Sequence, residues 1–255
     1  MPNYADEAVV YAKYLLKNRP EARMGILYQN DDMGITFLKG IEKGLGEKAS
    51  LILARQSFEI TAADVSSQIA NLKASGANTL FIAAMHKPVV QTLKTAAQMG
   101  WKPFLIIAST GSSMFAMSQV SPEIAEGSIT TIFYKDTSDP KWDSDAGMIL
   151  HKEVMAKYYP EGKVVDAQNM FGMSMAWMVE QILRTTGKTL TREGLQNSWR
   201  NMNYDRNAFL MPGIVNKTTP TDPRPLRSLY MAKFEVKEGK GRWAPFGEVL
   251  DARGQ

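Results

Sequence analysis

The sequence predicts an α/β fold, with a doubly wound parallel sheet in its first half and an incomplete second α/β lobe after it. Short apolar runs alternate with helical patterns from the start of the chain to about Tyr134. These runs are apolar along almost their whole length, which is typical of strands buried on both faces. After Tyr134 the helical patterns continue, but too few strands follow to cover them.

The elements of the first half can be justified in order. Apolar residues recur at helical spacing over 5–16, and Pro20 closes this first helix. An acidic turn at 30–32 separates the first strand from the second helix. Gly76 ends the third helix and Gly100 the fourth. We therefore expect helices at 5–16, 33–48, 64–75, 87–99 and 112–120, and strands at 23–29, 51–58, 78–84, 104–108 and 127–134.

This alternation also predicts where a ligand binds. In doubly wound sheets ligands gather just beyond the carboxyl ends of the strands. Here those ends are the segments 30–33, 85–86 and 109–112.

The second half has a different pattern. The polar segment 135–145 contains Asp139-Pro140, which suits a linker. Helices are expected at 143–159, 166–186 and 192–201, then a loop at 212–225 and strands at 228–235 and 242–246, joined by a turn. These helices either pack on the first domain or complete a domain whose other part is absent.

Composition excludes several classes of protein. The 255 residues include no cysteine and two histidines, which rules out disulfides, Fe–S clusters, thiol nucleophiles and cysteine-based zinc sites. The 30 basic and 26 acidic residues are interspersed, apart from a basic cluster at 233–242 that also carries two glutamates and is interpreted as a solvated face. No nucleic-acid partner is expected, because nucleic-acid surfaces need a denser basic stripe. No run approaches the roughly 20 apolar residues of a membrane span, and the first residues do not resemble a secretory signal.

No motif predicts catalysis or a cofactor. Gly40, Gly44 and Gly46 lie late in a helix, where no phosphate cradle forms, and Gly46 is interpreted as its terminator. Asp31 and Asp32 could form a carboxylate pair, but at a helix start we favour capping residues. We therefore expect that the chain is not an enzyme and that it binds neither a cofactor nor a metal ion.

Other candidates lie near the predicted ligand edge. The hydroxyls and backbone of Ser109–Ser113 could hold a polar ligand or cap a helix. His86 follows a strand at this edge and has either a ligand-binding or a structural role. His151 is interpreted as a surface histidine. The methionines of the helix at 166–186 are expected to be mostly core, with one or two facing a ligand.

Several segments together resemble one family. They are Tyr28–Gly34 (YQNDDMG), Leu72–Ala77 (LKASGA), Ala96–Pro103 (AAQMGWKP), Ala156–Gly162 (AKYYPEG) and Pro212–Pro225. The chain resembles the periplasmic substrate-binding proteins of branched-chain amino acid type ABC transporters, along nearly all of its length. The resemblance implies a type I periplasmic binding fold, in which two lobes close on a small ligand.

The resemblance also implies a domain organisation. Residues 1–134 resemble the complete C-terminal lobe, 135–226 the later part of the N-terminal lobe, and 227–255 a crossing strand and tail. The front part of the N-terminal lobe has no counterpart, which suggests a truncated chain. A periplasmic location and an ABC-transporter permease as partner follow from the resemblance only.

The family's ligand-lining positions carry different residues here. Amino-acid binders of the family usually have aromatic residues at the positions of Met33, Met85 and Met173, and an acid that pairs with the ligand's ammonium at the position of Thr110. Without that acid, an ammonium buried in the site would be costly. The resemblance therefore implies a hydrophobic or aromatic carboxylate ligand, held by these four residues and His86.

Three alternatives stay open. The chain could bind branched-chain amino acids, or catalyse a reaction at a site that no motif reveals. It could also be a truncated remnant or interaction module that binds no solute. Because an incomplete lobe would expose the apolar faces of its helices, this last reading predicts self-association.

Overall fold

The computed structural model describes residues 2–188 and 190–251. Within them the chain forms two compact units. Unit 1 contains Pro2 and Phe133–Leu229, and unit 2 contains Asn3–Ile132 and 230–251. Unit 2 is therefore built from both ends of the sequence, and unit 1 from its middle.

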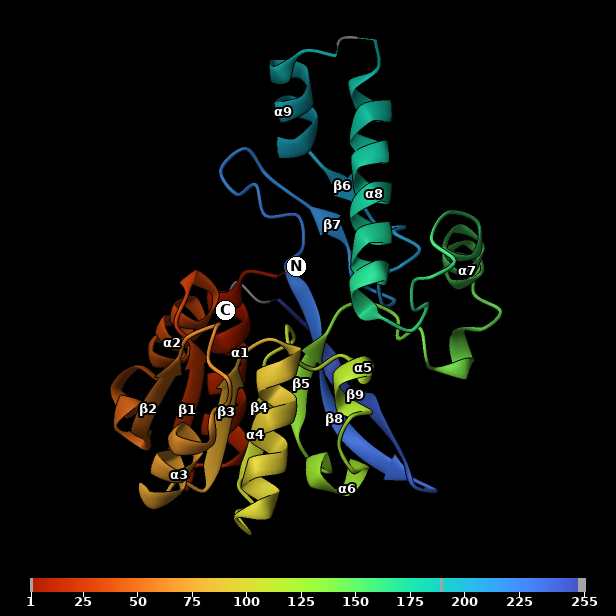
Figure 1. Cartoon of the computed structure of the whole chain (residues 1–255). Helices are drawn as coiled ribbons and strands as arrows, with labels where there is room; N and C mark the ends of the chain where they lie inside the picture. Colours follow the sequence, from red (N-terminus) through yellow and green to blue (C-terminus); the bar gives the residue numbers. More distant parts are fainter. Residues whose placement is uncertain (1, 189, 252–255) are drawn as a thin grey trace. The chain divides into compact units, whose positions relative to one another are not determined.

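Unit 2 is built on one seven-stranded sheet in the order β2-β1-β3-β4-β5-β8-β9 (Figure 1). Five strands are parallel, and β8 runs antiparallel to β5. Their bounds are β1 (Met24–Gln29), β2 (Ile52–Phe58), β3 (Thr79–Ala83), β4 (Phe104–Ile107), β5 (Ile129–Ile132), β8 (Ser228–Lys237) and β9 (Lys240–Asp251). The predicted α/β fold with a mostly parallel sheet is confirmed.

Helices follow the parallel strands as predicted, with differences at their ends. They are α1 (Tyr4–Asn18), α2 (Asp32–Leu45), α3 (Ser66–Ala74), α4 (His86–Gln98), α5 (Met114–Met117) and α6 (Pro122–Ala125). Gly46 ends α2 with a φ of 53°, and a 3₁₀ turn, η1 (Gly46–Leu51), follows it. The predicted helix at 112–120 is only the four residues of α5, and α6 was not predicted.

The strands of unit 2 differ in burial according to their place in the sheet. All five residues of β3, at its centre, are buried. The edge strand β2 alternates instead, because only one of its faces packs against a helix. Leu53, Arg55 and Ser57 are exposed, so this strand is not buried on both faces as the sequence predicts.

Two glycines let α1 lie directly on α2. A Cβ atom at Gly40 would lie 2.5 Å from the Ala5 carbonyl oxygen and 2.8 Å from the Ala8 Cβ. A Cβ atom at Gly44 would lie 2.6 Å from that of Ala12. These glycines, which form no phosphate cradle, thus serve close packing of two helices.

Unit 1 is mainly helical. It contains the turn η2 (Pro140–Trp142), the helices α7 (Ala146–Tyr158), α8 (Ala167–Thr186) and α9 (Arg192–Arg200), and a two-stranded sheet of β6 (Asn203–Tyr204) and β7 (Asn216–Lys217). Its buried side chains form small clusters rich in methionine, one of Met148, Met170 and Phe209 and one of Met178, Ile182 and Met202. The helical prediction holds here, whereas the small sheet was not predicted.

One sequence interpretation in unit 1 is wrong. His151 is completely buried, with its Nε2 3.0 Å from the Val164 carbonyl oxygen, because α7 turns this residue inward. Within the predicted linker 135–145, Lys135 is buried. The Lys135 Nζ lies 2.7 Å from both Asp145 Oδ2 and the Ala208 carbonyl oxygen, and 5.3 Å from the Trp142 ring centre.

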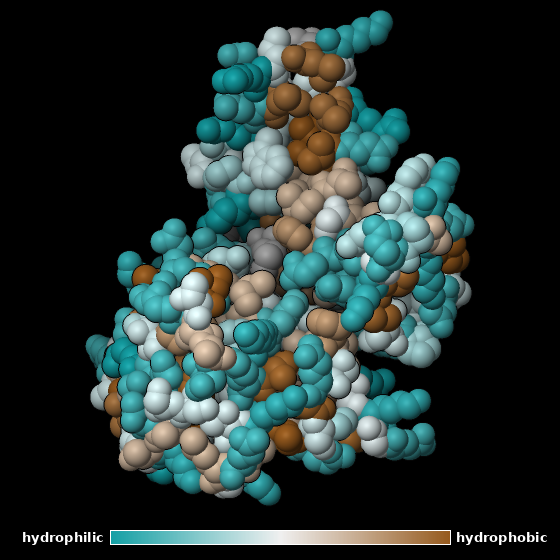
Figure 2. Space-filling view, in the orientation of Figure 1, coloured by the Kyte–Doolittle hydropathy of each residue, from teal (hydrophilic) through white to brown (hydrophobic). Residues whose placement is uncertain are grey.

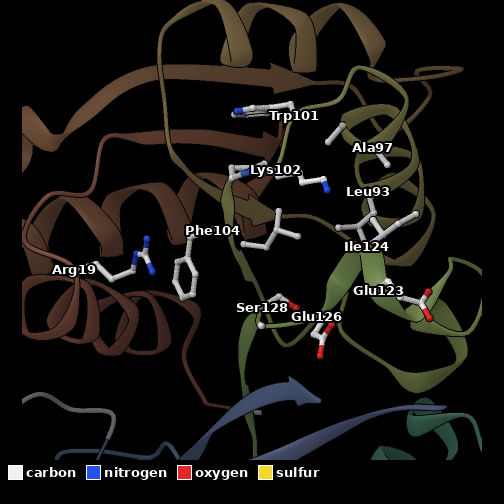
Figure 3. Close-up of a pocket in the computed structure, with 14 residues that line it drawn as sticks. Arg19, Leu93, Ala97, Trp101, Lys102, Phe104, Glu123, Ile124, Glu126 and Ser128 are labelled. Atoms are coloured by element: carbon white, nitrogen blue, oxygen red, sulfur yellow. The ribbon is translucent and has the colours of Figure 1, made fainter. Parts of the chain in front are cut away.

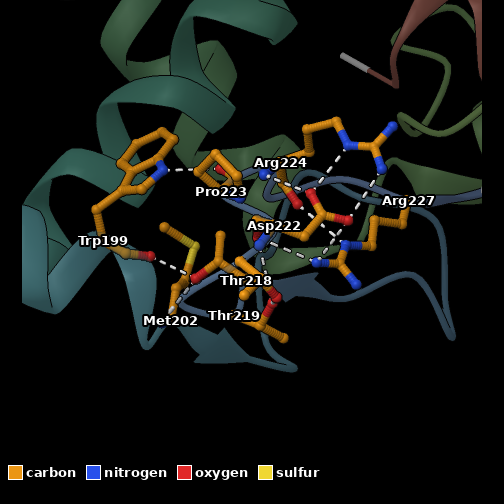
Figure 4. Close-up of polar contacts among 9 residues, drawn as sticks. Trp199, Met202, Thr218, Thr219, Asp222, Pro223, Arg224 and Arg227 are labelled. Atoms are coloured by element: carbon orange, nitrogen blue, oxygen red, sulfur yellow. Dashed lines mark hydrogen bonds and ion pairs between the residues drawn. The ribbon is translucent and has the colours of Figure 1, made fainter.

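The loop after β7 is held by polar contacts around Asp222 (Figure 4). Arg224 Nε and Arg227 Nη2 lie 2.9 and 3.0 Å from the two Asp222 carboxylate oxygens. The hydrogen bonds and charge of Arg224 lower the pKa of Asp222 to about 2. The loop is also tied to α9, since Trp199 Nε1 donates to the Pro223 carbonyl oxygen at 2.8 Å.

The helices of unit 1 expose large apolar side chains. Ile149 and Leu150 on α7, and Val179 and Leu183 on α8, are each 44–47% exposed. Figure 2 shows hydrophobic residues gathered over the region of α8 and α9. Among residues 2–188 and 190–251, however, no helix is both long and apolar enough to cross a membrane.

Candidate functional site

Three of the predicted loops meet at one edge of the sheet in unit 2. Because β1, β3 and β4 are neighbouring parallel strands, their carboxyl ends lie side by side. The segments that follow them are 30–33, 84–86 and 108–112, and they contain Met33, Met85, His86 and Thr110. The structure therefore brings four of the five predicted site residues to the same edge.

The first segment begins α2 and positions Met33. Asp31 is the N-cap of this helix: its Oδ1 accepts from the Gly34 N–H at 2.9 Å, and its Oδ2 from Gln29 Nε2. Gly34 lies so close to β1 that a Cβ atom there would lie 2.0 Å from the Gln29 carbonyl oxygen. The capping interpretation of Asp31 is therefore confirmed. Met33 follows in the first turn and is partly exposed.

The second segment begins α4. Met85 is the N-cap residue of this helix in extended conformation and is 37% exposed. His86 is the first residue of the helix and is partly buried. The edge thus presents one thioether to solvent beside the positive end of a 13-residue helix.

The third segment, the turn 109–112, packs tightly against the second. Thr110 is 4% exposed, and its hydroxyl donates to the Ala84 carbonyl oxygen at 3.1 Å. A Cβ atom at Gly111 would lie 2.6 Å from that same oxygen. Trp243 Nε1, on β9, donates to the Ser112 carbonyl oxygen at 2.6 Å. Ser113 caps α5, as one of the two interpretations of this segment expects.

A buried carboxylate lies behind this turn, and sequence reasoning missed it. Glu7 on α1 is completely buried, and its oxygens accept from the Ser109 N–H at 2.8 Å, the Ser109 hydroxyl at 2.8 Å and the Tyr11 hydroxyl at 2.7 Å. Burial raises the pKa of Glu7, and these hydrogen bonds lower it in part. Nothing in the sequence pairs Glu7 with Ser109, because 102 residues separate them.

The fifth predicted residue, Met173, belongs to unit 1. It lies on α8 and is partly buried against the cluster of Met148, Met170 and Phe209. Part of its surface therefore serves the small core of that unit.

Two hollows in unit 2 lie away from the carboxyl edge. One of about 510 Å³ opens at the amino ends of β4 and β5, lined by Trp101, Phe104 and Ile124 (Figure 3). Arg19 also lines it, with its guanidinium 4.3 Å above the Phe104 ring. The other, of about 640 Å³, lies between α1 and β9. In the described ranges no three histidine or carboxylate side chains cluster as metal ligands would.

The fold of this chain is similar to several solved structures of ABC-transporter binding proteins. A branched-chain amino acid ABC transporter protein from Thermus thermophilus with bound valine has 18% identity and a TM-score of 0.82. A solute-binding protein of an ABC transporter from R. palustris in complex with 4-hydroxybenzoate has 15% identity and a TM-score of 0.74, and a leucine-binding protein from Thermotoga maritima has 14% and 0.68. Each comparison covers 97% of this chain but only 65% of the other.

These likenesses show the fold, which is the type I periplasmic binding fold, and the chain spans about two thirds of the length of those proteins. No curated protein matches the sequence. A family model described as "Periplasmic binding protein" matches residues 1–241, which is nearly the whole chain. The chain therefore belongs to the periplasmic binding protein family.

Proposed function

We propose that this chain is the solute-binding component of an ABC uptake system, and that the carboxyl edge of unit 2 supplies part of a site for a small hydrophobic or aromatic carboxylate. The observation that carries the proposal is the chemistry of this edge. It presents the thioethers of Met33 and Met85, and the buried Thr110 lies in the turn at the same edge. At these three positions the resemblance implies aromatic residues and an acid in amino-acid binders of the family. Thioethers adapt to irregular apolar ligands, and Met173 is a further proposed contact.

Two of the three segments at this edge offer no carboxylate to an ammonium group, which supports a ligand without one. The segments 84–86 and 108–113 contain no aspartate or glutamate. Glu7 does touch the turn, but it is completely buried, and both of its oxygens accept from Ser109. These two segments therefore supply no free carboxylate for an ammonium desolvated against them. The third segment, 30–33, carries Asp31, which caps α2, and the exposed Asp32.

The same edge favours a carboxylate. The first turn of α4 carries His86 and Lys87 at the positive end of the helix dipole. A carboxylate group placed beside this turn would meet the positive end of the helix, and the apolar part of the same ligand would lie against Met85.

The relatives with bound valine and with leucine in their names favour a second candidate, a branched-chain amino acid. Asp31 is the observation that supports it, because its carboxylate lies at the same edge. That carboxylate already caps α2, so an ammonium would have to share it with Gly34 and Gln29. Asp31→Asn would abolish amino-acid binding and leave the affinity for an aromatic carboxylate nearly unchanged.

Isothermal titration with 4-hydroxybenzoate, benzoate, L-valine and L-leucine tests the proposal. We expect the aromatic carboxylates to bind and the amino acids not to. Met85→Glu, which adds a negative charge at an exposed position, should weaken carboxylate binding about tenfold or more, whereas Met85→Gln should have a smaller effect. Trp101→Ala, in the hollow at the amino edge, is the control that should bind normally.

Tight L-leucine binding without aromatic binding would refute the ligand assignment. Loss of binding in Trp101→Ala alone would move the site to the other edge of the sheet. Absence of any binding would favour the remnant or interaction module.

The exposed apolar residues of α7 and α8 support self-association as a second property. Contiguous exposed apolar surface is a common mark of an interface. Sedimentation velocity over a range of concentrations tests this, and a monomer at all concentrations would contradict it. The proposed membrane partner is the permease of the ABC transporter, and the proposed location is the periplasm, both from family membership.

A further inference from the structure

Glu7 is the most unusual charged residue of unit 2, because its carboxylate is fully buried. Burying a carboxylate is costly unless hydrogen-bond donors replace the lost water. Glu7 receives three such bonds, two from Ser109 and one from Tyr11, all between 2.7 and 2.8 Å. Donors to an ionised carboxylate form stronger bonds than donors to a neutral oxygen.

The contacts extend from Glu7 to two strands of the sheet. The Tyr11 hydroxyl accepts from the Thr131 N–H of β5 at 3.0 Å and lies 3.2 Å from its Oγ1. The neighbouring Thr130 donates from its hydroxyl to the Ile107 carbonyl oxygen of β4 at 2.7 Å. The carboxylate thus sits where α1 meets the carboxyl ends of β4 and β5.

The position of Glu7 is itself fixed by helix packing. It lies in the first turn of α1, between Ala5 and Ala8, which lie against Gly40 of α2. Because no Cβ atom fits at Gly40, α1 and α2 lie in close contact beside Glu7. The Glu7 carboxylate therefore reaches Ser109 from a helix that is closely packed on its neighbour.

The turn that receives the carboxylate is held on its other sides as well. Thr110 bonds to Ala84, Gly111 lies against the same segment, and Ser112 accepts from Trp243. Glu7 is the contact that holds Ser109, the first residue of this turn, through both its backbone N–H and its hydroxyl.

We propose that Glu7 is a positioning residue: it holds the turn 109–112 from inside the fold and so sets where Thr110 lies at the carboxyl edge. A neutral side chain would fill the same space at a lower cost of desolvation, and burial accordingly raises the pKa of Glu7. In return for this desolvation cost, the Glu7 carboxylate accepts two hydrogen bonds from a single residue, Ser109. The effect of this turn on a ligand rests on the proposed function, whereas the positioning does not.

Hydrogen exchange of the chain without ligand tests the positioning, using Glu7→Gln and Ser109→Ala. Gln keeps the shape of Glu7 but loses its charge and one acceptor, so we expect the amides of 109–112 to exchange about tenfold faster. Ser109→Ala removes only the hydroxyl and should give a smaller increase in the same amides. It also keeps the test decisive if Glu7→Gln fails to fold.

The matched control is Ile69→Val, which removes one methyl group from the core under α3, where Ile69 is fully buried. It should lower overall stability without a selective change at 109–112. Faster exchange in this turn alone, in both test variants, supports the proposal. Exchange that is unchanged in Ser109→Ala, or that rises equally in β1, α3 and the turn, would overturn it.

A titration with 4-hydroxybenzoate separates this result from the proposed function. If the turn contacts that ligand, Ser109→Ala should weaken its binding several-fold, and Ile69→Val should not. If the amides of 109–112 exchange selectively faster but 4-hydroxybenzoate does not bind, the proposed ligand is refuted and the positioning role of Glu7 is still supported.

Discussion

Replacing Gly40 by alanine should separate α1 from α2, although alanine is the better helix former. A Cβ atom there would lie 2.5 Å from the Ala5 carbonyl oxygen, whereas ordinary contacts begin near 3.4 Å, so the helices must part by about 1 Å. Since the obstructing atoms are backbone, we take the upper end of the usual overpacking cost, about 3 kcal/mol. Alanine regains about 1 kcal/mol of helix propensity. The net loss is about 2 kcal/mol.

Gly172 provides the matched control for this prediction. It is an exposed glycine within α8, and within the described part of the chain nothing lies within 4 Å of a Cβ atom built there. Gly172→Ala should therefore stabilise its helix by about 0.5–1 kcal/mol. Urea unfolding followed by circular dichroism measures both variants. If Gly40→Ala were as stable as the parent protein, the tight packing of the two helices would be refuted.

Three further predictions concern other contacts. Asp222→Asn should remove a pH dependence: because Arg224 lowers the pKa of Asp222 to about 2, its stabilising contribution is present above pH 4 and is lost as the pH falls towards 2, which urea midpoints across this range would show. Trp243→Phe should cost roughly 2 kcal/mol in urea unfolding, since the Ser112 carbonyl oxygen loses its donor inside the fold. Leu183→Glu should reduce self-association in sedimentation velocity, because this side chain is 44% exposed within the apolar surface of α8.

Each of these has a result that contradicts it. A constant stability difference between Asp222→Asn and the parent from pH 5 to pH 2 would mean that Arg224 and Arg227 do not favour the ionised form. Unfolding of Trp243→Phe at the parent's urea midpoint would mean that another donor or water serves Ser112. If Leu183→Glu and the partly exposed polar control Gln181→Glu changed association equally, net charge rather than the apolar surface would be responsible.

The sheet could be predicted from the sequence because its signals are local. Continuous apolar runs identify buried strands, and glycines such as Gly46 and Gly100 mark helix ends. The rule for parallel strands also predicts that Met33, Met85 and Thr110 lie at one edge, which the order of β1, β3 and β4 confirms. That these residues bind a ligand stays a prediction.

Features that depend on distant partners could not be predicted. Gly40 looks like any helical glycine until Ala5 is known to lie against it, and Glu7 resembles an ordinary acidic residue in a first turn until Ser109 is placed beside it. The sequence predicts His151 at the surface, because polar residues usually lie there, yet the carbonyl oxygen of Val164 makes its burial possible. In each case the deciding contact comes from packing and not from a local pattern.

Because unit 2 is formed by two separate segments of the chain, the order of synthesis affects how its sheet is completed. Ile132 of β5 faces Tyr230 of β8 across an antiparallel pair, although about 100 residues of unit 1 separate them. The five parallel strands are synthesised before unit 1, so the edge of β5 that pairs with β8 stays unpaired while unit 1 is translated. Such an edge invites pairing with other chains. The last two strands therefore act as a late closure of this edge, and an interrupted translation product would be prone to aggregate.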